Sequence, residues 1–163
     1  MKSTLIAIFL AGLTITSTQA QNNESVIKDN DQKIQFTVPD GWQSTKKGDG
    51  YLMGSENTHG FMLIKVQNFK SLKKLRSAME GGIEQEDGTI LELDGDLSNL
   101  GNQGVSGMYR GTIDGTEMQG FLMALMPPSK GRAAICITVA PVELFNQSNM
   151  DQLKILLRSV IFL

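Results

Sequence analysis

The sequence has few of the residues that usually carry chemistry or covalent stability. Its 163 residues include one cysteine, one histidine, one tryptophan and two tyrosines. A single cysteine cannot form an internal disulfide, so the fold must depend on its apolar core. The 15 basic and 17 acidic side chains give a formal net charge of −2. This charge does not favour a nucleic acid as the partner.

A long apolar run lies at the N-terminus. It extends from Leu5 to Ile15, follows Lys2, and leads through small and polar residues to Ala20. This pattern is typical of a secretory signal peptide, and the run is too short to span a bilayer core of about 30 Å as a helix. We therefore expect residues 1–20 to be removed during export to the periplasm or the medium, leaving no transmembrane span.

The rest of the chain divides into a short arm and one domain. Residues 21–32 are rich in Asn, Asp, Glu and Gln, which is typical of a poorly ordered segment. Residues 33–163 suffice for a single domain with its own core. The prediction is a signal peptide over 1–20, a flexible arm over 21–32 and one domain over 33–163.

The first clear strand runs from Ile34 to Val38, where apolar residues alternate with polar ones. Pro39-Asp40-Gly41 then predicts a tight turn, which leads directly to Trp42. Residues 44–50 are polar and contain two glycines, so they are expected to form a surface loop before a second short strand over 51–54.

Several later segments are apolar at both odd and even positions, which indicates strands that are covered on both faces of a sheet. These segments are residues 59–67, 121–126 and 134–140. Asp114-Gly115 lies between alternating segments 105–113 and 116–126, and this dipeptide favours a type I′ hairpin. A further strand is expected over 88–93, with a turn at 94–96. Cys136 falls in one of the buried strands and is expected to be an inert core thiol.

Two helices complete the pattern. Ser71 is a good N-cap for a helix whose apolar stripe is formed by Leu72, Leu75, Met79 and Ile83. Near the C-terminus, Asn149 and Gln152 resemble a capping box, and a stripe of Leu153, Leu156, Leu157 and Val160 follows. The expected fold is α+β, with an antiparallel sheet sandwiched between helices in α/β/α layers.

Short structural motifs resemble those of the PsbP-like superfamily, which includes the DcrB-type exported bacterial proteins. The resemblance lies in four features: the first strand and turn over 36–42, the helix after the early strands, the glycine-rich hairpin, and the C-terminal segment over 157–162. It implies an antiparallel sheet between helices. It also implies an accessory, partner-binding role without catalysis, and it does not identify the partner.

The sequence does not indicate an enzyme or a cofactor. A hydrolase would have to use His59, the only histidine, which lies at a turn, and no Gly-x-Ser-x-Gly motif is present. Carboxylate pairs occur at Glu84 with Glu86 and at Asp94 with Asp96. Both pairs lie in charged, turn-like sequence, which is typical of a solvated surface.

Two metal hypotheses are open. Asp94-Gly95-Asp96 begins like a calcium loop, but Asn99 and Val105 replace the glycine and the glutamate that such a loop needs. Methionine thioethers are soft ligands suited to copper(I), and Met108, Met118, Met123 and Met126 fall in one hairpin. Methionine also fills irregular cores, so no metal site is assigned.

The hypothesis that we favour is an exported, non-enzymatic binding or accessory domain that docks another envelope or secreted protein. Lys70, Lys73 and Lys74 lie at the start of the first helix, where basic charge opposes the helix dipole, so they are candidates for binding an anionic partner or a lipid surface. The ordinary alternative is a solvated helix face. Aromatic residues often anchor interfaces, so the remaining candidates are Trp42, Tyr51 and Tyr109. The alternatives are a copper(I) or small-ligand binding protein and, with less support, a hydrolase.

Overall fold

The computed structural model describes residues 25–84, 89–127 and 131–163. The predicted signal peptide and residues 21–24 of the predicted arm lie outside these ranges. The eight-stranded sheet contains β3 (Trp42–Lys47), β4 (Gly50–Ser55), β5 (Phe61–Asn68), β6 (Ile83–Glu84), β7 (Ile90–Asn99), β8 (Gly104–Ile113), β9 (Thr116–Leu125) and β10 (Arg132–Pro141). A three-stranded sheet contains β1 (Ser25–Asp29), β2 (Ile34–Val38) and β11 (Ile161–Phe162). The helices are α1 (Leu72–Glu80) and α2 (Gln147–Arg158).

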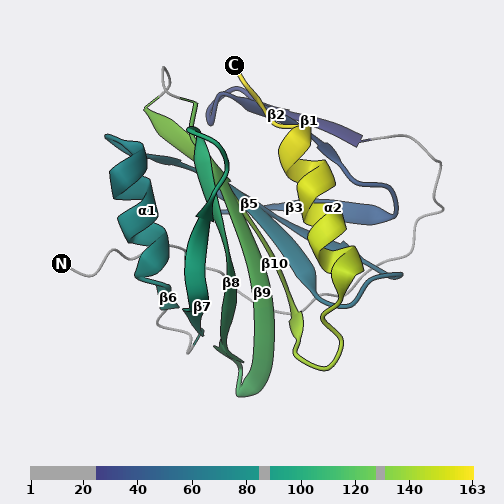
Figure 1. Cartoon of the computed structure of the whole chain (residues 1–163). Coiled ribbons are helices and arrows are strands. Elements are labelled where there is room, and N and C mark those ends of the chain that lie inside the picture. The colour runs from purple at the N-terminus through teal and green to yellow at the C-terminus, as the bar shows by residue number, and fades with distance from the viewer. Residues whose placement is uncertain (1–24, 85–88, 128–130) are drawn as a thin grey trace.

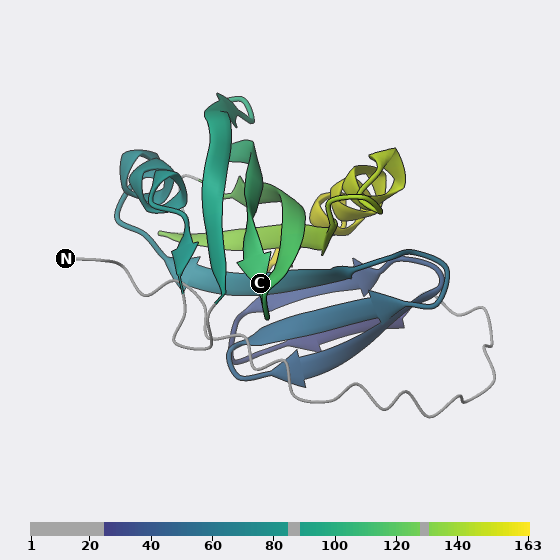
Figure 2. The same ribbon diagram turned by 90° about the horizontal axis from the view of Figure 1, so that it is seen from below.

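Every neighbouring pair of strands is antiparallel. The large sheet has the order β3-β4-β5-β10-β9-β8-β7-β6, and the small sheet has the order β1-β2-β11. Figure 1 shows α1 and α2 on either side of the large sheet, and Figure 2 shows how strongly this sheet curves. The antiparallel α+β fold predicted from the sequence is confirmed. The layering is less regular than a simple sandwich, because α2 shares its side with the three-stranded sheet.

Two hydrophobic cores lie on the two faces of the large sheet. Leu75 and Met79 of α1 belong to the first core, and Leu153 of α2 belongs to the second. Strand β10 contributes to both, as its apolar residues of both parities predict: Ile135 and Ile137 enter the first core. Its other face carries the smaller Ala134, Cys136, Thr138 and Ala140, all fully buried. Small side chains on this face leave room for α2 to pack directly on β10.

The hairpin at Asp114-Gly115 is confirmed in detail. Asp114 has φ of 50° and Gly115 has φ of 76°, as a type I′ turn requires, and β8 pairs with β9 from Gly104 to Ile113. Because Asp tolerates the left-handed region and Gly adopts it freely, this dipeptide sets the register of the hairpin.

Two segments that the sequence places in irregular structure form strands instead. Ser25–Asp29, assigned to the flexible arm, is β1 and pairs with β2 along its whole length. The predicted loop over 44–50 is largely β3, which pairs with β4 from Trp42 to Lys47. Polar composition misleads in both places because each strand lies at an edge, where most of its side chains face solvent.

Local details also differ from the prediction. Helix α1 ends at Glu80 with Gly81 as its C-cap, so Ile83 belongs to β6 and not to the helix. The capping box of α2 is formed by Asn146 and Asn149, three residues earlier than predicted. The turn expected at 94–96 is a bulge inside β7, where the register shifts between Asp94 and Ser98. At the C-terminal end, Phe162 packs against the second core, while Ile161 and Leu163 remain exposed.

Candidate functional site

Helix α1 presents exposed lysines close to its N-terminus, and we call Lys70, Lys73 and Lys74 the lysine face. Ser71 caps the helix, because its hydroxyl accepts a hydrogen bond from the backbone N–H of Lys74 at 3.2 Å. Leu75 is buried on the opposite side. All three lysines are exposed, and in the described part of the chain none of them forms an ion pair. Their ammonium groups are available to an external anion.

The charges on α1 oppose its dipole. Lys73 and Lys74 lie in the first turn, where the dipole favours acidic groups, and Glu80 lies in the last turn, where it favours basic ones. Each well-placed charge of this kind is worth about 0.3–1 kcal/mol at an exposed site. The lysine face therefore makes α1 less stable than a helix with the reverse charge order.

Contacts elsewhere hold α1 in place despite this cost. Arg76 binds Glu80 at 3.0 Å, and its guanidinium also donates to the side-chain oxygen of Asn99 at 2.8 Å and to the carbonyl of Leu97 at 2.9 Å. Both acceptors belong to β7, in the part of this strand that lies beyond its short pairing with β6, so Arg76 covers an edge that β6 leaves open. The guanidinium thus fixes the helix to the sheet and holds the lysine face in one orientation.

The buried phenol of Tyr109 completes this attachment. Its hydroxyl donates to the carbonyl of Met79 at 2.7 Å, close to the end of α1. Burial raises the pKa of Tyr109, and the nearby carboxylate of Glu80 adds to the effect. Tyr109 therefore remains a neutral hydrogen-bond donor and positions the C-terminal end of the helix.

The predicted aromatic anchors lie in three different environments. Trp42 is 7% exposed and packs in the second core, and Tyr109 is completely buried in the first. Tyr51 is half-buried and makes an edge-to-face contact with Phe36, with ring centroids 5.3 Å apart. The structure does not bring these aromatics together with the lysine face, so their contact with a partner stays a prediction.

A buried carboxylate that the sequence did not reveal links β1 to the large sheet. Asp29 accepts hydrogen bonds from Tyr51 at 2.6 Å and from Lys46 at 2.8 Å, and its other oxygen accepts from the backbone N–H groups of Asp31 and Gln32. The bond from the Gln32 backbone, followed by those from Lys46 and Tyr51, holds the pKa of Asp29 well below its usual range. The Asp29 cluster therefore ties the β1–β2 hairpin to β3 and β4.

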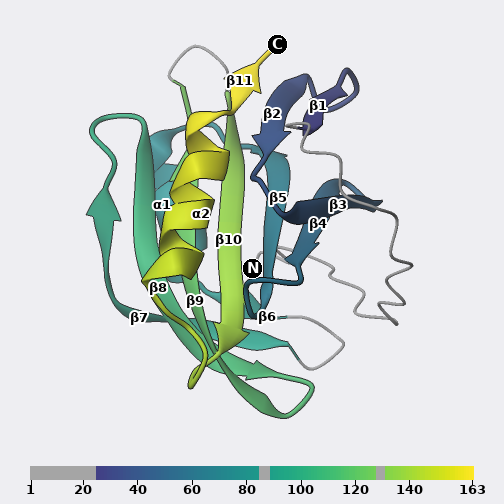
Figure 3. The same ribbon diagram turned by 90° about the vertical axis from the view of Figure 1, so that its right-hand side faces the viewer.

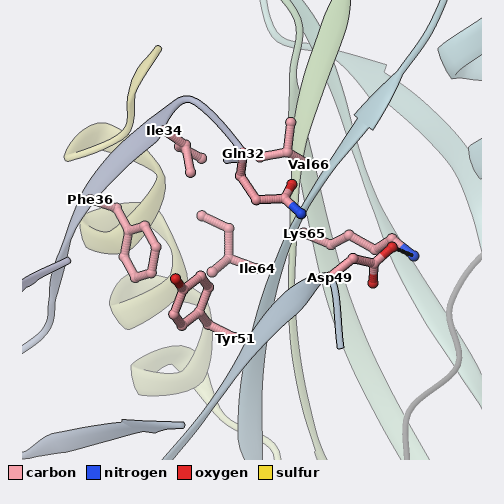
Figure 4. A pocket seen from close by; sticks show the side chains of 8 residues that line it. All are labelled: Gln32, Ile34, Phe36, Asp49, Tyr51, Ile64, Lys65 and Val66. Carbon is pink, nitrogen blue, oxygen red and sulfur yellow. Dashed lines mark ion pairs between the residues drawn. The ribbon is translucent and has the colours of Figure 1, made fainter. Parts of the chain in front are cut away.

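A shallow depression lies beside this cluster, between the small sheet and strands β4 and β5 (Figure 4). Its space, including open solvent, amounts to about 170 Å³. Lys65 and Asp49 form an ion pair of 2.7 Å at its side. The depression is smaller than the sites that usually enclose ligands, so it is a packing seam between the two sheets. Its lining residues are Gln32, Ile34, Phe36, Asp49, Tyr51, Ile64, Lys65 and Val66.

The residues considered for chemistry lie apart. His59 is exposed, and its backbone carbonyl accepts from the side chain of Asn149 at 2.8 Å. Asp94 and Asp96 are both exposed, and Asp94 pairs with Arg110 at 3.4 Å. Within residues 25–84, 89–127 and 131–163, no group of His, Cys, Asp and Glu side chains is arranged to hold a metal ion. Glu86 lies outside these ranges, and hydrolysis through His59 stays a prediction.

The sulfur-containing side chains divide between the two cores. Met118 and Met126 are buried in the first core, while Met123 packs against the second, as the alternation along β9 predicts. Copper(I) binding by these methionines stays a prediction. Cys136 is completely buried, and burial raises the pKa of its thiol, so it is the unreactive core residue expected from the sequence.

No protein-family model matches the chain, and no curated protein matches it by sequence. Solved structures do match. Cyanobacterial PsbP (CyanoP) from Synechocystis sp. PCC 6803 is 11% identical with a TM-score of 0.56, and the match covers 93% of this chain and 99% of that one. The Ran-binding protein Mog1p of Saccharomyces cerevisiae is 8% identical with a TM-score of 0.56, over 86% and 95% of the two chains.

These matches establish the fold. The chain has a PsbP-like fold. A protein of Bacteroides thetaiotaomicron is also similar, with 10% identity, a TM-score of 0.59 and 86% of this chain covered. The chain spans about half of that protein, 48% of its length. Because all these identities are far below 25%, the likeness confirms the PsbP-like fold and carries no function with it.

Proposed function

We propose that the protein is an exported, non-enzymatic accessory domain that docks another protein of the cell envelope or secretome through the lysine face of α1. The observation that carries the proposal is the combination of exposure, lack of ion pairs within the described residues and unfavourable position at Lys73 and Lys74. A chain under selection for stability alone would place acidic residues there. Binding of an acidic partner gives a reason to retain the lysines.

The chemistry of the lysine face defines the partner. Ammonium groups on flexible stems recognise carboxylates as point charges and do not impose bidentate geometry. Long-range attraction between opposite charges speeds encounter, and salt screens it over about 8–10 Å at moderate ionic strength. We therefore expect a protein partner with an acidic surface, and an affinity that falls as the salt concentration rises.

Two further considerations support the proposal by analogy. Yeast Mog1p, which shares the fold, is described as a Ran-binding protein, so this architecture is compatible with protein recognition. The second consideration is the resemblance of the sequence to DcrB-type exported proteins. We propose that this chain shares their export and their layering of helices on both sides of the sheet. In the described part of the chain, no helix has the length and apolar character needed to cross a membrane.

The test is a crosslinking pull-down of the exported protein from its own envelope and medium, read by mass spectrometry. Lys73→Glu is compared with Lys47→Glu, which reverses the same charge at an exposed site on β3. We expect Lys73→Glu to weaken capture of a specific acidic partner by about fivefold or more, since one surface ion pair is worth up to about 1 kcal/mol and reversal adds repulsion. Equal capture by the two variants would contradict the proposal.

A further inference from the structure

The outer face of the three-stranded sheet carries large aliphatic side chains that the fold leaves in solvent. Strands β1 and β11 flank β2, with Val26 opposite Thr37 and Ile161 opposite Gln35. Because paired residues point to the same face, Val26 and Ile161 lie on the side opposite to the core residue Phe36. Their exposed fractions are 56% and 52%, so packing within the described chain does not account for them.

Two more aliphatic residues extend this surface. Leu163 follows Ile161 by two positions, is 40% exposed, and donates its backbone N–H to the carbonyl of Lys33 at 2.9 Å. Ser159 accepts a hydrogen bond from the backbone N–H of Thr37 at 2.9 Å, which places the end of α2 beside β2. Ile155 lies one turn earlier and is 50% exposed. Figure 3 shows β11 and β2 next to this end of α2. We call Val26, Ile155, Ile161 and Leu163 the aliphatic patch.

Basic groups surround the aliphatic patch. Lys28 shares the outer face of β1 with Val26, Lys33 lies in the β1–β2 loop, and Arg158 precedes Ser159; all three are exposed. Among the acidic groups of the hairpin, Asp29 is turned inward to Lys46, and Asp31 is exposed. A second copy of the chain on this surface would bring these cations close to one another. An anionic surface would complement them.

The position of β1 in the chain connects the aliphatic patch to a bilayer. The apolar N-terminal run ends at Ile15, and β1 begins at Ser25. Residues 16–24 reach about 30 Å at full extension. If the apolar run is inserted in a membrane during export, the start of β1 is held within about that distance of the lipid surface, so a chain that folds before the run is removed forms the aliphatic patch close to the bilayer.

We propose that the aliphatic patch docks on the surface of an anionic lipid bilayer. The side chains of Val26, Ile155, Ile161 and Leu163 enter the boundary between headgroups and acyl chains, and Lys28, Lys33 and Arg158 bind headgroup phosphates. This docking is separate from the lysine face of α1. It keeps the protein at the membrane after the signal peptide is removed and leaves the lysine face to a protein partner.

The test measures co-sedimentation of the exported protein with vesicles of phosphatidylglycerol and phosphatidylcholine, or of phosphatidylcholine alone. The variant is Val26→Thr with Ile161→Thr, which keeps β-branched side chains on the strands and removes apolar surface. Ile90→Thr, at a 44% exposed residue of β7, is the matched control. We expect the double variant to bind the anionic vesicles at least about tenfold more weakly, because burial of two aliphatic tips is worth at least that factor. The control should bind normally.

Charge provides the second arm of the test. Binding to anionic vesicles should fall with added salt and in Lys28→Gln with Arg158→Gln, and phosphatidylcholine alone should bind weakly. The proposal is overturned if the unaltered protein does not co-sediment, if the aliphatic variant and its control bind equally, or if binding is lost in Lys73→Glu instead. A dimer in sedimentation analysis that the Val26 and Ile161 substitutions abolish would also overturn it, because a second copy would then cover the patch. Capture of a protein partner does not depend on these outcomes.

Discussion

The two helices pack on opposite faces of one sheet, but they differ in how their own sequences stabilise them. Helix α2 begins with the Asn146–Asn149 capping box and carries Arg158 in its last turn, where the dipole favours a cation. Helix α1 has a cap at Ser71 but lysines in its first turn and Glu80 in its last. The charges of α2 therefore stabilise it. In α1 the charges interact unfavourably with the helix dipole, and nothing in the described part of the fold requires this charge order.

Side-chain contacts compensate α1 for this cost. Arg76 reaches two residues of β7, and Tyr109 binds the carbonyl of Met79 from the sheet. These contacts come from residues of opposite character: one guanidinium at the surface and one phenol in the core. The comparison teaches that where the local sequence of an element disagrees with its structure, contacts from the rest of the fold hold the element in place, and such an element is the first place to test for a functional surface.

The largest expected effect concerns the core under α2. Leu153→Ala removes a completely buried side chain and should lower the free energy of unfolding by about 2–5 kcal/mol. Ile155→Ala, in the same helix but 50% exposed, should change it by less than about 0.5 kcal/mol. Urea denaturation followed by circular dichroism measures both. A similar loss in the two variants would show that α2 does not bury the side chains assigned to it.

The next effect concerns the small sheet that shares the α2 side. Asp29→Asn weakens hydrogen bonds from Lys46 and Tyr51 to a charged acceptor and should cost about 1.5–3 kcal/mol near neutral pH. Because the folded pKa of Asp29 is lowered, its contribution is present above the unfolded pKa of about 4 and is lost as pH falls through the folded pKa. The gap between variant and parent should therefore narrow in acid. The measurement is the free energy of unfolding of both proteins as a function of pH. A difference that stays constant from pH 7 into the acid range would contradict the stabilising role of the Asp29 carboxylate.

The smallest effect tests the contrast between the helices directly. Lys73→Glu at the start of α1 should raise the free energy of unfolding by about 0.3–1 kcal/mol, and Arg158→Glu at the end of α2 should lower it by a similar amount. Both substitutions change the net charge equally, so a general effect of charge would give them the same sign. Thermal unfolding at low salt measures the difference, and adding salt should reduce it.

Local signals in the sequence were sufficient for the elements that depend on neighbouring residues. Asp114-Gly115 fixes its hairpin, Ser71 caps α1, and apolar residues of both parities place β10 between two cores. Elements that depend on distant partners were missed. The polar strand β1 is held by pairing with β2 and by Lys46 and Tyr51, which bind Asp29 across the fold. The local composition of β1 does not predict those long-range contacts.

The same division between local and long-range features applies to the candidate site. Helical spacing predicts that Lys73 and Lys74 are exposed when Leu75 is buried, and the structure shows this. The environment of the aromatic residues was not predictable, because Trp42 and Tyr109 are buried by segments far away in the chain. A partial sequence signal for the Asp29 cluster is the Asp at the end of β1, whose side chain caps the N–H groups two and three residues later.

The position of β2 between the first and last strands has a consequence for the order in which the fold forms. Ser159 bonds to Thr37 across 122 positions of the chain, and β11 completes the small sheet from the same distant segment. A chain that crosses a membrane with its N-terminal end first exposes the apolar side of β2 long before α2 and β11 arrive to cover it. Contacts of such long sequence separation form late and slowly. Under the export that we propose, the chain would therefore pass through an intermediate with exposed apolar surface, which lasts at least until residues 147–162 have crossed.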